Sequence, residues 1–261
     1  MRELLTRMHE WMTRYMKSFY SEDAEVQQGI LIKEKHTGYV TANCVELAKF
    51  LKLPPHDAEL AEIIGLFHDV GRFRQYSIYK TFNDADSEDH ADLALKVIDE
   101  LEFFKELSAQ DYEIVKFAIQ NHNKKVIAPT EDARKEFFAK IIRDADKLDI
   151  YRVLEPFLAQ DAADKMPNFI KSNSRLVAEI SPDFVENFVT GEQADYRKIR
   201  TNGDRKIVRL MWIYDINFSW TMKKIVERGY IEKIVSNLPM DEKIAEGVRR
   251  LKLHVEEKLK T

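Results

Sequence analysis

His68 and Asp69 stand side by side inside the apolar segment GLFHDV, residues 65–70. A carboxylate is rarely buried without a partner, because an unpaired buried charge costs several kcal/mol or is neutralised. Imidazole and carboxylate groups are ligands that suit Zn, Mn, Fe or Ni, and a bound cation would keep Asp69 ionised. The pair therefore predicts a metal site.

Further candidate ligands are spread along the first 150 residues. They are His36, His90, His122 and an aspartate near position 146, and with the pair they follow one another at steps of 32, 22, 32 and 24 residues. Each step is roughly one helical hairpin, so a bundle could aim side chains from five helices at one point. In RDADKLD, Asp144 and Asp146 lie about 160° apart around a helix and cannot face the same ion, whereas Asp146 and Asp149 lie about 60° apart.

The segments EKHTGYV, GLFHDVGRF and RDADKLDIY resemble, in this order, the HD superfamily of metal-dependent phosphohydrolases, which is named after the adjacent His and Asp. The resemblance covers about residues 30–155. It implies a basic set of metal ligands made of His36, His68, Asp69 and Asp146. Members with two further histidines hold a second ion, which here implies His90 and His122. Asp144 or Asp149 is then left to orient a ligand or to cap a helix.

The resemblance also implies an enzyme, a metal-dependent phosphohydrolase that acts on ester bonds. It would hydrolyse a phosphomonoester or phosphodiester in a nucleotide-like small molecule by metal-activated water, with one or two divalent ions of Mn, Zn, Fe, Ni or Mg as cofactor. Asp69 would bridge or anchor the ions, and His90 or His122 would serve as general acid if only one ion binds. The basic residues expected to bind the phosphate are Arg72, Arg143 and Lys147.

Two alternatives stay open. Di-iron oxygenases that resemble this superfamily use the same ligand arrangement, and a non-catalytic nucleotide-binding regulatory module would retain the pocket without turnover. Guanosine tetraphosphate hydrolases of the family carry acidic residues after the pair, where this chain reads VGRF, and the GYP element of cyclic-dinucleotide phosphodiesterases is missing.

A second adjacent pair, His56 and Asp57, follows two prolines, and we interpret Asp57 as a helix cap rather than a catalytic residue. We interpret the calcium-like DADSED, residues 84–89, as a polar loop.

The composition is typical of a folded protein without a polyanionic partner. Of 261 residues, 44% are hydrophobic and 33% charged, and the net charge of −4 favours no nucleic acid polymer. Cys44 is the only cysteine, so no intramolecular disulfide can form. No apolar run approaches the ~20 residues that span a bilayer, and we predict a cytoplasmic protein with no membrane partner. A homo-oligomer is compatible with the sequence.

The apolar face from Leu4 to Phe19 could lie on a membrane surface, but packing against the protein's own body is favoured.

Helical periodicity predicts an all-α fold, an HD-domain-like helical bundle with a helical C-terminal extension. We place an HD-type metal-binding domain at residues 1–160 and the extension at residues 161–261, packed on it as one structural unit. Helices are expected over Asp23–Leu51, Ala58–Val70 with a terminal Gly71, Ser87–Leu107, Asp111–Asn121, from Glu131, between Ser181 and Gly191, and from Asp241. Residues 72–87 are predicted to be irregular, and TNGD at 201–204 to be a turn.

Overall fold

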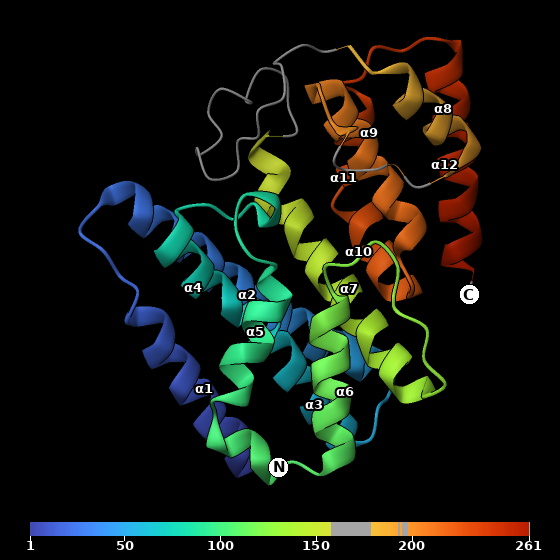
Figure 1. Ribbon diagram of the computed structural model, residues 1–261. Helices are drawn as coiled ribbons and strands as arrows, with labels where there is room; N and C mark the ends of the chain where they lie inside the picture. The colour runs from blue at the N-terminus through green and yellow to red at the C-terminus, as the bar shows by residue number, and fades with distance from the viewer. Residues whose placement is uncertain (158–178, 193, 195–197, 261) are drawn as a thin grey trace. The chain divides into compact units, whose positions relative to one another are not determined.

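The computed structural model describes residues 1–157, 179–192, 194 and 198–260, and all regular structure in these residues is helical (Figure 1). The predicted all-α fold is thereby confirmed. The earlier helices are α1 Arg2–Lys17, α2 Ala24–Phe50, α3 Pro55–Phe67, α4 Val70–Tyr79, α5 His90–Asp99, α6 Ala109–Asn121 and α7 Ala133–Leu154. The later helices are α8 Pro182–Thr190, α9 Asn202–Met211, α10 Ser219–Glu227, α11 Tyr230–Val235 and α12 Glu242–Leu259.

The chain divides into two compact units, Met1–Asp149 and Ile150–Thr261. The boundary predicted at residues 160–161 lies outside the described residues. That the C-terminal part packs on the first as one structural unit stays a prediction.

In the first unit, α2 packs on α3, α4 on α5, and α6 on both α3 and α5. Gly65 allows a close approach of α3 to α2, because an added Cβ would lie 2.9 Å from Cys44 Sγ and 3.0 Å from Thr41 Cα. This approach sets the separation between the histidines that the two helices carry.

The N-terminal helix α1 packs on α3 with its apolar face, as the sequence favoured. The buried side chains are Leu4, Leu5, Met8, Met12 and Met16. No helix among the described residues combines the length and the apolar character needed to cross a bilayer. The cytoplasmic location stays a prediction.

Several helix ends follow the local signals in the sequence. The Asp23 carboxylate accepts hydrogen bonds from the main-chain N–H groups of Glu25 and Val26 and so caps α2. Gly191 follows α8 with a φ of 75°, a left-handed conformation that glycine adopts without strain. Asp241 caps α12 through the N–H of Ile244.

The predicted helix end at Gly71 and the predicted irregular structure of residues 72–79 were wrong. The helix α3 ends at Phe67, the chain turns at Asp69 with φ −107° and ψ 14°, and α4 then runs from Val70 to Tyr79. Gly71 therefore lies inside α4 and not at the end of α3. The buried rings of Phe73 and Tyr76 explain why this segment is helical, since tertiary burial outweighs its polar composition.

Three further boundaries also differ from the sequence prediction. The helix expected from Ser87 to Leu107 is capped by Asp89 and ends at Asp99, and a 3₁₀ helix covers Glu102–Glu106. Asp57 lies in the first turn of α3, after the N-cap residue Pro54, and pairs with Arg134 at 2.6 Å.

TNGD is a helix start and not a turn. Thr201 and Asp204 form a reciprocal capping box at the beginning of α9. Asp204 also accepts hydrogen bonds from the main-chain N–H and the hydroxyl of Ser181, and its side chain is fully buried. These contacts join α8 to α9 in the second unit.

Candidate metal centre

The predicted ligands come from consecutive helices of the first unit. His36 lies in the middle of α2, His68 follows α3, and Asp69 occupies the turn before α4. The others lie at the start of α5, at the end of α6 and within α7, and are His90, His122 and Asp146. A turn at Asp69 and two helix termini thus direct side chains from different helices toward one carboxylate.

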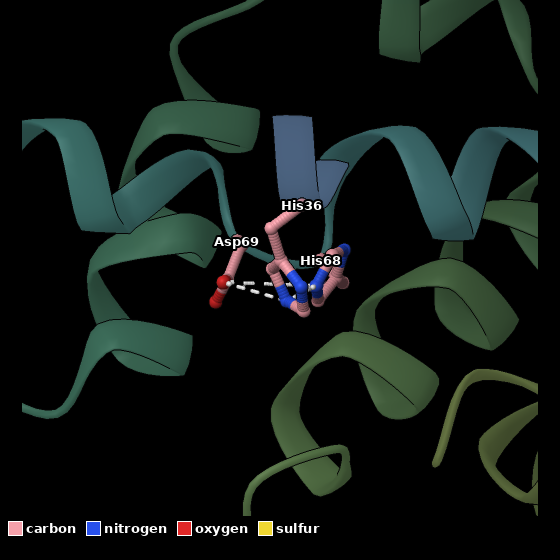
Figure 2. Close-up of side chains that lie close together, drawn as sticks. All are labelled: His36, His68 and Asp69. Carbon is pink, nitrogen blue, oxygen red and sulfur yellow. Dashed lines mark hydrogen bonds and ion pairs between the residues drawn. The ribbon is translucent and has the colours of Figure 1, made fainter. Parts of the chain in front are cut away.

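His36 and His68 approach the Oδ2 atom of Asp69. Their Nε2 atoms lie 3.5 Å and 3.7 Å from it, and Figure 2 shows both rings on the same side of the carboxylate. Asp146 closes this group, because its Oδ1 atom lies 3.1 Å from His36 Nε2 and 3.9 Å from His68 Nε2. The two Nε2 atoms are 3.4 Å apart.

His90 and His122 approach the other oxygen of the same carboxylate. Their Nε2 atoms lie 3.5 Å and 3.7 Å from Asp69 Oδ1, and 3.0 Å from each other. Asp69 therefore presents one oxygen to each pair of histidines. The structure brings together all the side chains that the sequence proposed as metal ligands.

The opposite nitrogen of each ring is held by an acceptor. The Nδ1 atoms of His68 and His122 donate to the main-chain carbonyls of Gly65 and Ile119, at 2.8 Å and 2.6 Å. A carbonyl oxygen only accepts, so in the neutral ring the proton is on Nδ1 and the lone pair is on Nε2.

Carboxylates hold the other two rings in the same way. His36 Nδ1 lies 2.7 Å from Asp149 Oδ2, and His90 Nδ1 lies 2.6 Å from Asp84 Oδ2. An ionised carboxylate is also only an acceptor, so the Nδ1 atoms of these two rings carry a proton. Carboxylate contacts of this kind fix the tautomer and the orientation of metal-binding imidazoles.

This donor set fits a divalent metal ion. The Nε2 atoms of the four rings face one another and the oxygens of Asp69 and Asp146, and the neutral rings of His68 and His90 turn their lone pairs inward. At 3.0 Å between His90 and His122, such an arrangement is repulsive unless a cation lies within it. Imidazole and carboxylate ligands are those preferred by Zn, Mn and Fe. Two buried groups of potential ligands share Asp69, one with His36 and His68, the other with His90 and His122.

Cations outside the ligand set also stabilise Asp69. Lys33 Nζ lies 2.7 Å from its Oδ2, and Arg72 Nε lies 3.5 Å from its Oδ1. Burial alone would raise the pKa of Asp69, but Lys33, His68, His122 and Arg72 outweigh it and hold the pKa well below its usual value. Burial likewise acts to raise the pKa of Asp146, and its hydrogen bond with His36 lowers the pKa instead.

The histidines differ in their affinity for a proton. Burial lowers the pKa of His68 to about 4 and that of His90 to about 3. Burial and Lys33 act in the same direction on His36, but its hydrogen bonds to Asp146 and Asp149 raise its pKa above the usual value. At neutral pH, His68 and His90 are therefore neutral and ready to bind a metal ion.

The residues predicted to bind phosphate fall in different places. Arg72 lies beside Asp69 and donates to Asp84 and to the main-chain carbonyl of Phe82, at 2.9 Å and 2.6 Å. Lys147 is partly buried in α7.

Arg143 is buried, and its guanidinium donates to main-chain carbonyls, those of Asn121, Lys124 and Lys125. This arrangement supports the segment after α6 and engages donors that a phosphate would need. These contacts give Arg143 a structural role, and phosphate binding by Arg143 stays a prediction.

Sequence reasoning missed two partners of the ligands. Lys33 precedes His36 by three residues, a helical spacing that could have revealed it. Asp84 belongs to the DADSED segment interpreted as a polar loop, and its contact with His90 depends on the fold of that loop. Of the two acids left open for orienting a ligand, Asp149 is the one that contacts His36.

The second adjacent pair lies in ordinary ion pairs. His56 Nε2 is 3.0 Å from Asp111 Oδ2, and Asp57 contacts Arg134. Neither residue is part of the described ligand groups.

The first unit is thus a helical bundle in which histidines and aspartates surround one buried carboxylate. This arrangement defines the class of the protein, a helical protein with a candidate metal site. Residues 34–151 match the family model described as HD domain, so the chain contains a domain of the HD superfamily, as the sequence resemblance predicted. Proteins of this superfamily are generally metal-dependent hydrolases. No curated protein and no solved structure matches the chain.

Proposed function

We propose that the protein is a metal-dependent phosphohydrolase that cleaves a phosphomonoester or phosphodiester in a nucleotide-like small molecule. One observation carries the proposal: each oxygen of Asp69 faces its own pair of histidine Nε2 atoms, at 3.5 Å and 3.7 Å in both cases. This arrangement would hold two cations on either side of one bridging carboxylate.

Divalent ions bound there would supply Lewis acidity to a phosphoryl group and lower the pKa of water toward ~7. The protein's own contribution is to hold the donors in place. Asp149 and Asp84 keep the proton of His36 and His90 on Nδ1, so that the Nε2 atoms stay available. Asp69 stays ionised because Lys33 and Arg72 lie beside it.

The surroundings of Asp69 support a phosphorylated substrate with an aromatic part. The ammonium of Lys33 and the guanidinium of Arg72 lie 5.4 Å and 6.0 Å from the centre of the Phe82 ring. Tyr76 stacks on the same ring with centroids 4.4 Å apart. Cations suit phosphate oxygens and aromatic rings suit a base, which favours a nucleotide-like ligand.

The pKa of His90 bears on the role left open for it. A general acid at neutral pH works best with a pKa near 7, and burial lowers that of His90 to about 3. His90 is therefore a poor proton donor without a metal ion. This favours His90 as a ligand of a second ion over the general-acid role of a one-metal site.

Metal removal and reconstitution test the proposal. The metal content of the purified protein is measured, and phosphate release from phosphomonoesters and phosphodiesters is assayed after adding back Mn, Zn, Fe, Ni or Mg. We expect His68→Ala to lose both bound metal and hydrolysis. The matched control is His56→Ala, which removes a histidine from the second His-Asp pair and should keep both.

Two results would contradict the proposal. Iron-dependent uptake of O₂ without phosphate release would favour the oxygenase alternative. A metal-replete protein that binds nucleotides but hydrolyses no ester of the panel would favour the regulatory module.

A further inference from the structure

Two arginines lie one turn apart on α9 in the second unit. Arg205 and Arg209 have the spacing i, i+4, which places their side chains on one face of the helix. Arg209 is only 8% exposed, whereas Arg205 is partly exposed. Of the two side chains, Arg205 is therefore the more accessible to solvent.

Neither guanidinium has a hydrogen-bond acceptor or an acidic partner among the residues that the structure describes. Other buried charged groups of this molecule do have hydrogen-bond partners. The buried guanidinium of Arg143 donates to main-chain carbonyls, and the buried carboxylate of Asp204 accepts from the N–H groups of Ser181, Arg200 and Thr201. Buried charges in native proteins are almost always paired, so Arg209 is an exception that requires an explanation.

The two charges also repel each other. Burial, and then the neighbouring Arg205, lower the pKa of Arg209 to about 10, so both groups remain cationic at neutral pH. A buried guanidinium beside a second cation is costly unless an anion lies between them. The unfavourable pairing would be relieved by a ligand with negative charge on more than one oxygen.

The helix α9, which carries the pair, is fixed by hydrogen bonds at its first turn and near its end. The capping box of Thr201 and Asp204 fixes its first turn, and the Tyr151 hydroxyl donates to the main-chain carbonyl of Arg209 at 2.5 Å. The arginines are thus presented on a rigid element, as a preformed binding site requires.

We propose that Arg205 and Arg209 form a binding site for a small oxyanion, the phosphate group of a free or esterified phosphate. Two guanidinium groups offer several N–H donors in a planar arrangement that matches phosphate oxygens and balances a double negative charge. The site consists of residues of the second unit and does not depend on the proposed hydrolysis.

Phosphate binding by the metal-free 261-residue chain tests this site, because chelation with EDTA removes binding through a metal ion. Inorganic phosphate is titrated at constant ionic strength against chloride, with calorimetry and thermal unfolding as readouts. We expect phosphate to raise the Tm of the wild-type protein. Acetate at the same concentration should raise it less.

Substitutions locate the site. Arg205→Met should weaken phosphate binding at least about tenfold, the loss of one charge-assisted contact. Arg209→Met should abolish the phosphate-dependent rise in Tm. Without phosphate, its Tm should equal or exceed that of the wild type, because the substitution removes an unpaired buried charge. The control is Arg249→Met on the exposed face of α12, which removes the same charge and should bind phosphate as the wild type does.

Several outcomes would overturn the proposal. Unchanged phosphate affinity in Arg205→Met would place the anion elsewhere. A lower Tm or failure to fold in Arg209→Met without phosphate would mean that Arg209 has a structural partner. Equal stabilisation by acetate and phosphate would exclude a site built for phosphate.

Discussion

Replacing Gly71 by alanine would place a methyl group between α4 and α5. A Cβ at this position would lie 2.4 Å from the main-chain oxygen of His90 and 2.5 Å from the main-chain nitrogen of Ala94. Ordinary contacts of this kind begin at 3.4 Å, so the two helices would have to separate by about 1 Å. Because both contacts are to main-chain atoms, no flexible side chain can move aside.

The displacement would act directly on the metal centre. Asp69 precedes α4 and His90 begins α5, so moving the helices apart lengthens the 3.5 Å distance from Asp69 Oδ1 to His90 Nε2. The group of His36, His68 and Asp146 contains no residue of α5 and should be retained. We expect Gly71→Ala to lose affinity for the second ion while the first still binds.

The stability cost combines two opposing terms. Overpacking costs about 1–3 kcal/mol, and alanine in place of a helical glycine recovers up to about 1 kcal/mol. The net loss should be about 1–2 kcal/mol, or a few degrees of Tm for a chain of this size. Thermal unfolding of the metal-free protein measures the loss, and calorimetric titration with Mn²⁺ or Zn²⁺ measures the stoichiometry.

Gly38→Ala is the matched control. Gly38 lies in α2, two residues from His36, and an added Cβ would meet nothing within 4 Å. Removing a helical glycine there should raise stability by about 0.5–1 kcal/mol and leave metal binding unchanged. If Gly71→Ala bound two ions with wild-type affinity, or if Gly38→Ala impaired binding equally, the reasoning about α4 and α5 would be refuted.

Other predictions concern single side chains. Asp149→Ala removes the acceptor of His36 Nδ1 and should lower metal affinity by about 10- to 100-fold in chelator competition, so unchanged affinity would refute its orienting role. Lys33→Met leaves the central carboxylate without its nearest cation and should destabilise the metal-free protein by about 2–3 kcal/mol, unlike Lys35→Met on the exposed side, and added metal should restore most of that loss. The pKa of Asp204 is lowered because its hydrogen bonds outweigh burial, so the carboxylate contributes stability above the ordinary pKa of 3.8 that is lost as pH falls through the folded value. Asp204→Asn should therefore lower the Tm at neutral pH and flatten its acid dependence, and an unaltered pH profile would contradict this.

The sequence was most informative where structure depends on near neighbours. Helical periodicity, the Asp23 cap and the glycine after α8 are local features, and each follows from a few consecutive residues. The order of His36, the central pair, His90, His122 and an acid near 146 also stands in the sequence, with steps of roughly one helical hairpin between them.

Local patterns failed where distant contacts decide the backbone. Residues 70–79 form a helix because Phe73 and Tyr76 are buried against other helices, which their polar neighbours do not reveal. The cap of α5 is Asp89 rather than Ser87, because the Ser87 hydroxyl instead contacts Gln75 and Asn83.

By itself, the sequence determined which side chains were available for a metal site, and on which helices they stand. Only the tertiary structure decided their partners: Asp149 lies 113 positions from His36 in the chain yet contacts its ring, and Arg143 turns to main-chain carbonyls. The physical reason is the distance along the chain between the residues that interact. Caps and helical faces depend on residues a few positions apart, whereas the partner of a buried charge depends on which helices meet, and this is set by packing across the whole unit.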